Sequence, residues 1–145
     1  KERLKGRVRL DYVLPDYYAD TPKACMGGWG AKMILINPRG QALPCHSAET
    51  IPGYPIPSVK DSSLGEIWNS SPLFNAFRGD DWMMEPCRSC DNKSRDFGGC
   101  RCQALALAGD ARATDPVCRK SPERIRIDEF ILSREDQVAP PVYRA

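Results

Sequence analysis

The chain contains 145 residues, which is enough for one domain with a modest core. A formal net charge of +2, with the basic residues scattered, argues against a nucleic-acid-binding protein and against an acidic tail. No apolar run is long enough for a signal peptide or a membrane-spanning helix, so a cytoplasmic protein is the default expectation.

The first predicted element is a strand at residues 7–14, where apolar and polar residues alternate up to Pro15. The glycine-rich stretch CMGGWG at residues 25–30 suits a close approach of the backbone to a bulky group. Residues 32–36 and 41–43 predict a hairpin, because Asn37-Pro38-Arg39-Gly40 between them has the proline and glycine positions of a type I turn.

Two short helices are expected after an irregular loop at residues 51–57. Ser62 or Ser63 can cap the first helix, and Ser71 can cap the second, which has a proline at its first position and ends at Gly79. The apolar residues with helical spacing are expected in the core: Leu64, Ile67, Trp68, Leu73, Phe74 and Phe77.

The last third of the chain is predicted to be mostly irregular. Residues 87–102 consist almost entirely of turn-forming residues and cysteines, and residues 103–108 predict a short helix that Gly109 ends. An alternating run follows Ser121, with Ile125, Ile127 and Phe130, and the final residues are expected to be mobile.

With 13 prolines and 11 glycines, such a loop-rich domain buries too little apolar surface to offset its conformational entropy comfortably. The seven cysteines are therefore the expected stabilising groups. Disulfides are disfavoured, because the count is odd and no secretion signal is visible. Zinc remains open, since seven cysteines and His46 could form two four-ligand sites of an interaction module without a redox role.

Iron–sulfur clusters are the other explanation, since they also take thiolates in fours. In an extended segment, the side chains of Cys100 and Cys102 would share a face, which suits two ligands of one cluster. The full spacing is more specific: Cys25-x14-Gly40-x4-Cys45, then Cys87-x2-Cys90-x5-Asp96-x3-Cys100, then Cys118. This pattern resembles the SPASM domain, the auxiliary-cluster extension of radical S-adenosylmethionine (SAM) enzymes, over about residues 22–120, including the stretch SLGEIW.

Asp96 stands where the general family pattern has a third cysteine of that group. The stretches TPKACMGGWGAK and CRSCDNKSRDFGGCRC narrow the resemblance to PqqE-type peptide cyclases of pyrroloquinoline quinone biosynthesis, in which aspartate replaces that cysteine. The resemblance implies two ligand sets: Cys25, Cys45, Cys100 and Cys102 for a first auxiliary cluster, of 2Fe–2S type, and Cys87, Cys90, Asp96 and Cys118 for a second, of 4Fe–4S type. Many relatives take one ligand of the first cluster from a cysteine between positions 25 and 45, and here Cys102 would serve instead.

The implied fold is α+β: a small loop-rich domain with a β-hairpin and short helices organised around the two clusters, without the barrel domain. Residues 1–24 would be the remnant of a connection from a missing N-terminal radical SAM barrel, residues 25–118 the SPASM domain, and residues 119–145 a C-terminal tail. Because no CxxxCxxC string occurs, this part alone should lack catalytic residues and activity.

In the whole enzyme, a radical SAM oxidoreductase with a further SAM-binding 4Fe–4S cluster, the implied reaction joins a glutamate and a tyrosine of the precursor peptide PqqA by a carbon–carbon bond. The carrier protein PqqD would present the peptide, and an external donor such as flavodoxin would supply electrons. The clusters of this chain would transfer electrons, with direct substrate ligation as the rival role. A stand-alone ferredoxin-like carrier is a further alternative.

Four individual residues also have expected roles. Asp96 is either an exposed loop carboxylate beside Arg95 or an exchangeable oxygen ligand that shifts a reduction potential. His46 is expected to donate a hydrogen bond near the first cluster or to lie on the surface, rather than to bind metal. Trp29 and Trp82 are expected to pack and to shield.

Overall fold

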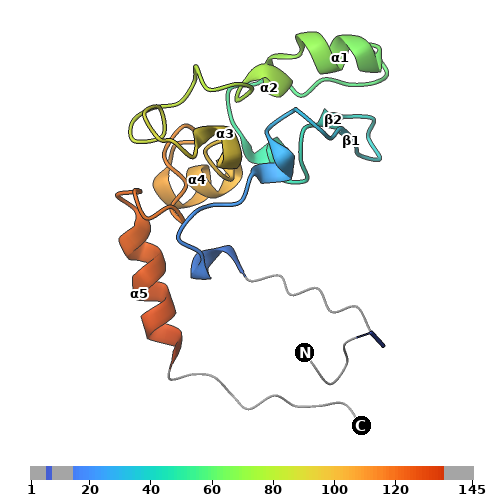
Figure 1. Ribbon diagram of the computed structural model, residues 1–145. Helices are drawn as coiled ribbons and strands as arrows, with labels where there is room; N and C mark the ends of the chain where they lie inside the picture. Colours follow the sequence, from blue (N-terminus) through green and yellow to red (C-terminus); the bar gives the residue numbers. More distant parts are fainter. Residues whose placement is uncertain (1–5, 8–14, 136–145) are drawn as a thin grey trace.

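The computed structural model describes residues 6–7 and 15–135, and it has an α+β architecture of short elements (Figure 1). Most of the strand predicted at residues 7–14 lies outside the described residues. Within the described part, the chain forms one two-stranded sheet and no barrel. The elements are the 3-10 helices η2 (Asp16–Tyr18), η3 (Cys25–Gly27) and η4 (Ala48–Thr50), the strands β1 (Leu35–Ile36) and β2 (Ala42–Leu43), and the helices α1 (Leu64–Ser70), α2 (Pro72–Asn75), α3 (Lys93–Asp96), α4 (Arg101–Ala108) and α5 (Arg124–Glu135).

The predicted hairpin is confirmed, although its strands are shorter than expected. Strands β1 and β2 pair antiparallel with Leu35 opposite Leu43. The turn is closed by a hydrogen bond from the Gly40 nitrogen to the Asn37 carbonyl at 2.9 Å. Gln41 falls outside β2; its carbonyl accepts from the Asn37 nitrogen across the turn at 3.0 Å, and it also forms a bridge with Ser58 of the following loop.

Helix α1 begins where Ser63 caps it, as predicted. The Ser63 hydroxyl accepts a hydrogen bond from the Glu66 nitrogen, and the Glu66 carboxylate accepts one from the Ser63 nitrogen, which forms a capping box. Ile67 is buried as expected, whereas Leu64 is 53% exposed, so its placement in the core was wrong. Leu64 occupies the first position of the helix and does not lie on the face that packs against α2.

Helix α2 is shorter than predicted, since it ends at Asn75 and not near Gly79. Ser71 occupies its N-terminal boundary, but the Ser71 side chain makes no capping hydrogen bond. The Ser71 backbone nitrogen instead donates to the Ile67 carbonyl at the end of α1, so this residue joins the two helices through its backbone. The predicted core residues Leu73, Phe74 and Phe77 are buried.

The glycine-rich stretch before the hairpin packs closely against α2. Gly30 has φ +59°, and a Cβ atom there would lie 2.5 Å from the Phe74 carbonyl oxygen, so only glycine fits. The indole nitrogen of Trp29 donates to the Leu73 carbonyl at 2.8 Å, and the Trp29 ring contacts Phe77 edge-on, with 5.1 Å between centroids. The bulky group approached by this glycine is therefore another part of the same chain.

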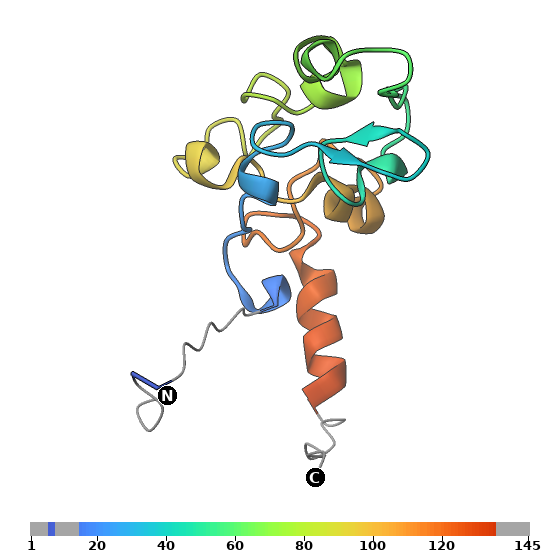
Figure 2. The ribbon, with the colours of Figure 1, turned by 90° about the vertical axis from the view of Figure 1, so that its right-hand side faces the viewer.

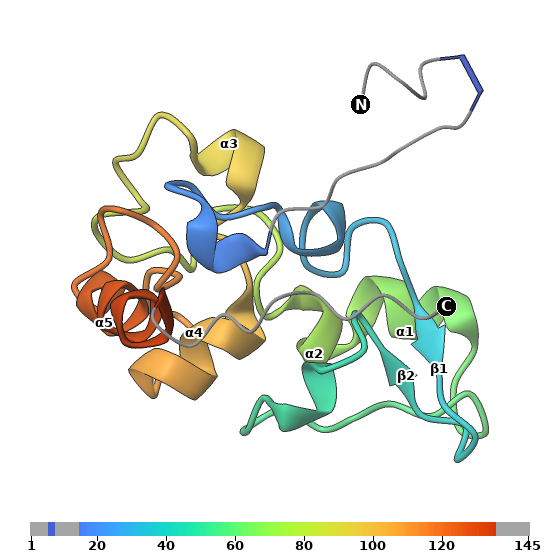
Figure 3. The same cartoon turned by 90° about the horizontal axis from the view of Figure 1, so that it is seen from below.

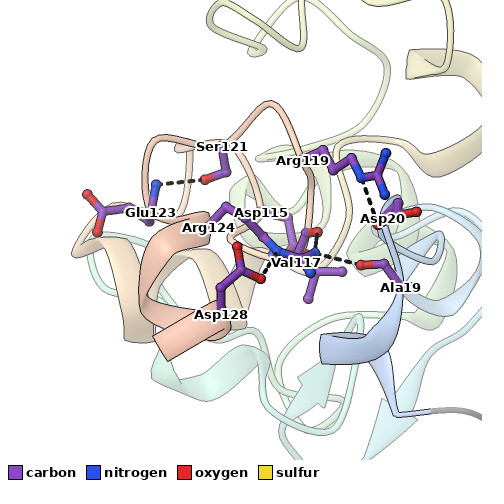
Figure 4. Close-up of polar contacts among 9 residues, drawn as sticks. All are labelled: Ala19, Asp20, Asp115, Val117, Arg119, Ser121, Glu123, Arg124 and Asp128. Atoms are coloured by element: carbon purple, nitrogen blue, oxygen red, sulfur yellow. Dashed lines mark hydrogen bonds and ion pairs between the residues drawn. The ribbon is translucent and has the colours of Figure 1, made fainter. Parts of the chain in front are cut away.

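The alternating run after Ser121 does not form a strand, because residues 124–135 form the helix α5. Arg124 donates to the carbonyl oxygens of Ala19 and Val117, both at 2.6 Å, and forms an ion pair with Asp128 one turn later at 2.7 Å (Figure 4). These contacts, and a hydrogen bond from Arg126 to the Leu107 carbonyl of α4, hold the first turns of α5 to the rest of the chain, while its C-terminal end extends away from the other elements (Figures 1 and 2). The final residues, which are expected to be mobile, lie outside the described part.

Seen from below, α3, α4 and α5 lie on one side of the described chain, and the hairpin with α1 and α2 lies on the other (Figure 3). Helix α4 begins at Arg101, two residues before the predicted start, and it ends at Gly109 as predicted, where φ is +79°. No helix in the described residues is long and apolar enough to cross a membrane.

Candidate metal centres

Four of the seven thiols form one group, which we call the first quartet: Cys25, Cys45, Cys100 and Cys102. Cys25 opens η3, Cys45 follows β2, and the other two lie at the start of α4. The Sγ atoms of Cys45 and Cys102 lie 4.0 Å apart. Cys25 also acts on the ionisation of Cys45 and Cys100, and Cys100 acts on that of Cys102. The four thiols therefore lie close together, in a ring drawn from three separate segments.

Within this ring the thiols alternate between donors and acceptors. Hydrogen bonds from Cys102 and Cys25 lower the pKa of Cys45 to about 3 and that of Cys100 to about 2. The same interactions raise the pKa values of Cys25 and Cys102 above the ordinary thiol value. Cys45 and Cys100 are thus the thiolates of the ring, and metal binding would have to release the protons of Cys25 and Cys102.

Backbone N–H groups add to the stabilisation of the negative charge at this quartet. Ser47 donates a backbone hydrogen bond to the thiolate of Cys45, and the first turn of α4 donates to Cys100 through the nitrogens of Cys102 and Gln103. Donors of this kind favour the anionic sulfur over the thiol. The N-terminus of α4 thus points at one of the expected ligands.

The expectation that residues 100–102 form an extended segment is wrong. Cys100 is extended, with φ −87° and ψ 115°, but it is the N-terminal boundary of α4, and Cys102 lies within the helix. The two thiols nevertheless meet in the first quartet, while the intervening Arg101 is buried, with only 1% of its surface exposed. Cys100 and Cys102 are therefore brought together at the first turn of a helix and not along an extended segment.

The remaining four expected ligands line a single pocket, and we call them the second quartet: Cys87, Cys90, Asp96 and Cys118. The pocket is a small cavity of about 10 Å³, and Pro22, Pro86, Gly98, Thr114 and Lys120 complete its wall. Burial is the main reason why the pKa of Cys87 is raised. The pocket combines three sulfur donors with one carboxylate.

Asp96 ends α3 and is half-buried, so it is not the freely exposed loop carboxylate of the simpler expectation. Its Oδ1 accepts a hydrogen bond from the Gly98 nitrogen at 2.9 Å, which fixes the orientation of the side chain. Phe97 at the end of the helix has φ +51°, and this sharp turn leads directly into the glycines that precede Cys100. Asp96 thereby faces the same pocket as the three cysteines.

Several residues around the quartets were not singled out from the sequence. The Lys120 ammonium donates to the Cys90 Sγ at 3.3 Å, and this contact raises the pKa of Lys120. The Thr114 hydroxyl oxygen lies 3.6 Å from the Cys87 Sγ. The spacing of the cysteines contains no signal for either residue, since each reaches its sulfur only through the folded loops.

His46 is exposed and belongs to neither quartet. Trp29 is a buried packing residue as expected, while the half-buried Trp82 contacts Phe77 edge-on at 5.1 Å between centroids. Within residues 6–7 and 15–135, no three His, Cys, Asp or Glu side chains are arranged to hold a single metal ion. All seven cysteines are free thiols, which removes the disulfide explanation for this structure.

The donor sets fit iron–sulfur clusters, which are held by four ligands, chiefly thiolates. The first quartet offers four soft sulfur atoms in one ring, and the second offers three sulfur atoms and one oxygen around a common pocket. Residues 25–91 match the family model SPASM, described as an iron-sulfur cluster-binding domain. The matched region includes Cys25, Cys45, Cys87 and Cys90 of the two quartets.

Almost the whole chain is also similar to proteins named PqqA peptide cyclase. It is 55% identical over 143 residues to the one from Gluconobacter oxydans (strain 621H), covering 99% of this chain and 40% of that relative. The identity is 54% over 144 residues for Methylobacterium sp. (strain 4-46) and 56% over 143 residues for Methylorubrum extorquens (strain PA1), with 99% of this chain and 38% and 37% of the relatives covered. The chain therefore spans about two fifths of the length of these curated relatives, and it matches their C-terminal part.

Proposed function

We propose that this chain is the auxiliary-cluster domain of a radical SAM peptide cyclase of pyrroloquinoline quinone biosynthesis, and that it serves electron transfer. The first quartet would hold a 2Fe–2S cluster, and the second quartet would hold a 4Fe–4S cluster. The observation that carries the proposal is the convergence of the eight side chains as two separate groups, each drawn from segments far apart in the sequence.

When bound, clusters of these types exchange single electrons. The residues of this chain favour such a role because they fix the ligands from several directions. Backbone N–H groups of α4 orient Cys100, and the Lys120 ammonium stabilises negative charge on Cys90. Trp29 and Phe77 form a dry aromatic contact beside the hairpin, which limits the reorganisation of solvent near the first quartet.

Asp96 gives the second quartet a hard oxygen donor among thiolates. Oxygen donates less electron density than sulfur and exchanges more readily, so this ligand would raise the reduction potential and allow one iron to change its ligand. The hydrogen bond from the Gly98 nitrogen orients the Asp96 carboxylate at the wall of the pocket. An exchangeable ligand could also let the iron bind substrate directly, and this is the less favoured role for Asp96.

In the whole enzyme, the expected substrate is the peptide PqqA, in which a glutamate and a tyrosine become joined by a carbon–carbon bond. PqqD would present the peptide, and a flavodoxin-like donor would supply electrons. The SAM-cleaving 4Fe–4S cluster would lie on an N-terminal barrel to which residues 1–24 connect, while residues 25–118 form the cluster domain and residues 119–145 the tail. Residues 1–145 alone would be inactive.

We place the protein in the cytoplasm, because all seven cysteines are free and thiolate ligands require a reducing compartment. Lasting disulfides, which are typical of secreted domains, would remove the ligands of both quartets. This location also agrees with the use of a soluble electron donor.

The direct test is the metal content of the full-length protein, purified without oxygen. The proposal predicts a brown protein with iron and acid-labile sulfide, and anomalous scattering at the iron edge at both quartets. Serine substitution of Cys45 should remove the spectroscopic signal of the first cluster and leave that of the second. A colourless protein with two zinc ions would overturn the redox role and establish a zinc-stabilised interaction module.

The activity has its own test, since cluster binding alone does not define the reaction. The full-length protein, with PqqA, PqqD, SAM and a reduced flavodoxin, should yield a peptide that lacks one pair of hydrogen atoms. Fragmentation should locate the new bond between the glutamate and tyrosine side chains. Cleavage of SAM without any change in the peptide would argue against this substrate.

A further inference from the structure

Arg101 lies between two expected ligands of the first cluster and is almost completely buried, with 1% of its surface exposed. Its Nη1 donates to the carbonyl oxygens of Ala111 and Ala113, both at 2.9 Å, and its Nη2 donates to the carbonyl of Gly98. The guanidinium also lies 4.7 Å from the centroid of the Trp82 ring. These contacts hold the cation in one fixed position in the interior.

A buried cation needs compensating negative charge, because the interior solvates it poorly. Among residues 15–135, however, no carboxylate forms an ion pair with Arg101, and its Nε has no hydrogen-bond acceptor. Carbonyl dipoles alone therefore satisfy its donors. The charge of Asp115 acts on Arg101 without forming an ion pair and does not outweigh the effect of burial on the guanidinium.

The ionisable groups close enough to act on Arg101 belong to both quartets. Besides Asp115, they are Cys87 of the second quartet, and Cys100 and Cys25 of the first. The loop that Arg101 fastens, residues 111–113, leads directly to Thr114 beside Cys87, and Gly98 lies between Asp96 and Cys100. The guanidinium is thus placed where the walls of the two candidate metal centres meet.

We propose that Arg101 is a shared positioning residue whose fixed positive charge raises the reduction potentials of both clusters together. This inference rests on the proposed function, because it concerns the clusters that the two quartets would hold. A cluster gains one negative charge on reduction, so a nearby cation stabilises the reduced form more than the oxidised form. The effect is large in a poorly solvated interior, where charges interact over longer distances than in water.

Asp115 carries a negative charge in the same region, so it is expected to lower the reduction potentials of the clusters. It is 2% exposed and accepts a hydrogen bond from the Cys100 nitrogen at 2.6 Å. Substitution Asp115→Asn removes one negative charge while it keeps an oxygen acceptor of similar size. This change should stabilise the reduced clusters, and the potentials should rise.

The experiment uses the full-length protein purified without oxygen, with iron and sulfide measured for every variant. Redox titrations followed by electron paramagnetic resonance should show lower potentials of both clusters in Arg101→Gln, and potentials close to those of the unmodified protein in Arg101→Lys, which keeps the charge. Asp115→Asn should raise both. Lys120→Gln is the matched control, since Lys120 donates to Cys90 and lines the pocket of the second quartet, so its loss should affect the second cluster alone.

Unchanged potentials in Arg101→Gln with both clusters loaded would overturn the inference. So would equal shifts in Arg101→Gln and Arg101→Lys, because these would report lost packing and not lost charge. If Arg101→Gln fails to assemble, Asp115→Asn decides: a rise in both potentials supports the shared field, and no change refutes it. Absence of iron and sulfide from the unmodified protein would instead refute the proposed function itself.

Discussion

The carboxylate of Asp115 accepts a hydrogen bond from the backbone nitrogen of Cys100 at 2.6 Å. The Asp115 backbone carbonyl accepts another from the nitrogen of Cys118 at 2.9 Å. Cys100 belongs to the first quartet and Cys118 to the second, so one buried residue fixes the backbone of an expected ligand in each. The Gln103 amide and the Val117 nitrogen complete the hydrogen bonds of the carboxylate.

Replacement of Asp115 by alanine should lower the stability of the cluster-loaded protein by about 2–4 kcal/mol, because buried donors lose their acceptor. The free energy of unfolding, measured in urea without oxygen, checks this value. Asp110→Ala is the matched control, since Asp110 is exposed and accepts a hydrogen bond only within its own turn, from the Arg112 nitrogen. A similar loss in both variants would contradict the special position of Asp115.

Removal of the metal should leave a largely unfolded chain. The first quartet joins residues separated by up to 77 positions along the chain (25 to 102), and short elements with little core do not hold such segments together by themselves. Circular dichroism before and after treatment with an iron chelator measures the change. A spectrum of the iron-free protein that keeps its native shape would refute this expectation.

Gly99→Ala should be far more damaging than Gly109→Ala, although the two glycines have nearly equal φ angles of +78° and +79°. A Cβ atom at Gly109 meets nothing within 4 Å, so only the backbone strain of about 1–2 kcal/mol applies. At Gly99 the same atom would lie 2.4 Å from the Asp115 Oδ2 and 2.7 Å from the Pro22 Cβ. Thermal unfolding of both variants tests this prediction, and equal midpoint temperatures would contradict it.

Asp96→Cys should keep the second cluster assembled and lower its reduction potential, because sulfur donates more electron density than oxygen. The potential of the first cluster should stay unchanged and serves as the internal control. Redox titration of the full-length protein provides both values. An unchanged potential together with unchanged peptide cyclisation would remove any special role for Asp96.

The capping box of α1 predicts a local dependence on pH. Hydrogen bonds from the backbone nitrogen and the hydroxyl of Ser63 lower the pKa of Glu66. The contribution to the helix is therefore fully present above the ordinary pKa of glutamate and is lost as the pH falls through the lowered value. Amide resonances of residues 63–66 should report this transition by NMR, and Glu66→Gln should abolish it.

The sequence predicted the hairpin, the cap at Ser63, the end of α4 at Gly109 and the main core residues, because each depends on local turn or helix preferences. It failed at α5, where Ile125 and Phe130 suggested alternation but remain exposed. The start of this helix depends on contacts of Arg124 with Ala19 and Val117, and Ala19 lies 105 residues away in the sequence. No local pattern contains that information.

The grouping of the ligands came from the family resemblance, and the structure brings the first four thiols close together and lines one pocket with the second set. The side chains around these groups could not be found in the same way. Arg101 stands between two cysteines in the sequence, and its position there does not distinguish a buried arginine from an exposed one. Its burial depends on the loop at residues 111–113, whose carbonyl oxygens accept its hydrogen bonds.

The order of the ligands along the chain also has a consequence for biosynthesis. Cys25 and Cys45 leave the ribosome long before Cys100 and Cys102, with which they form the ring, and Cys118 follows later still. Neither site can be completed on a nascent chain that stops short of residue 102. Delivery of iron and sulfide must therefore come late in translation or after it, and until then the early thiols need protection from oxidation.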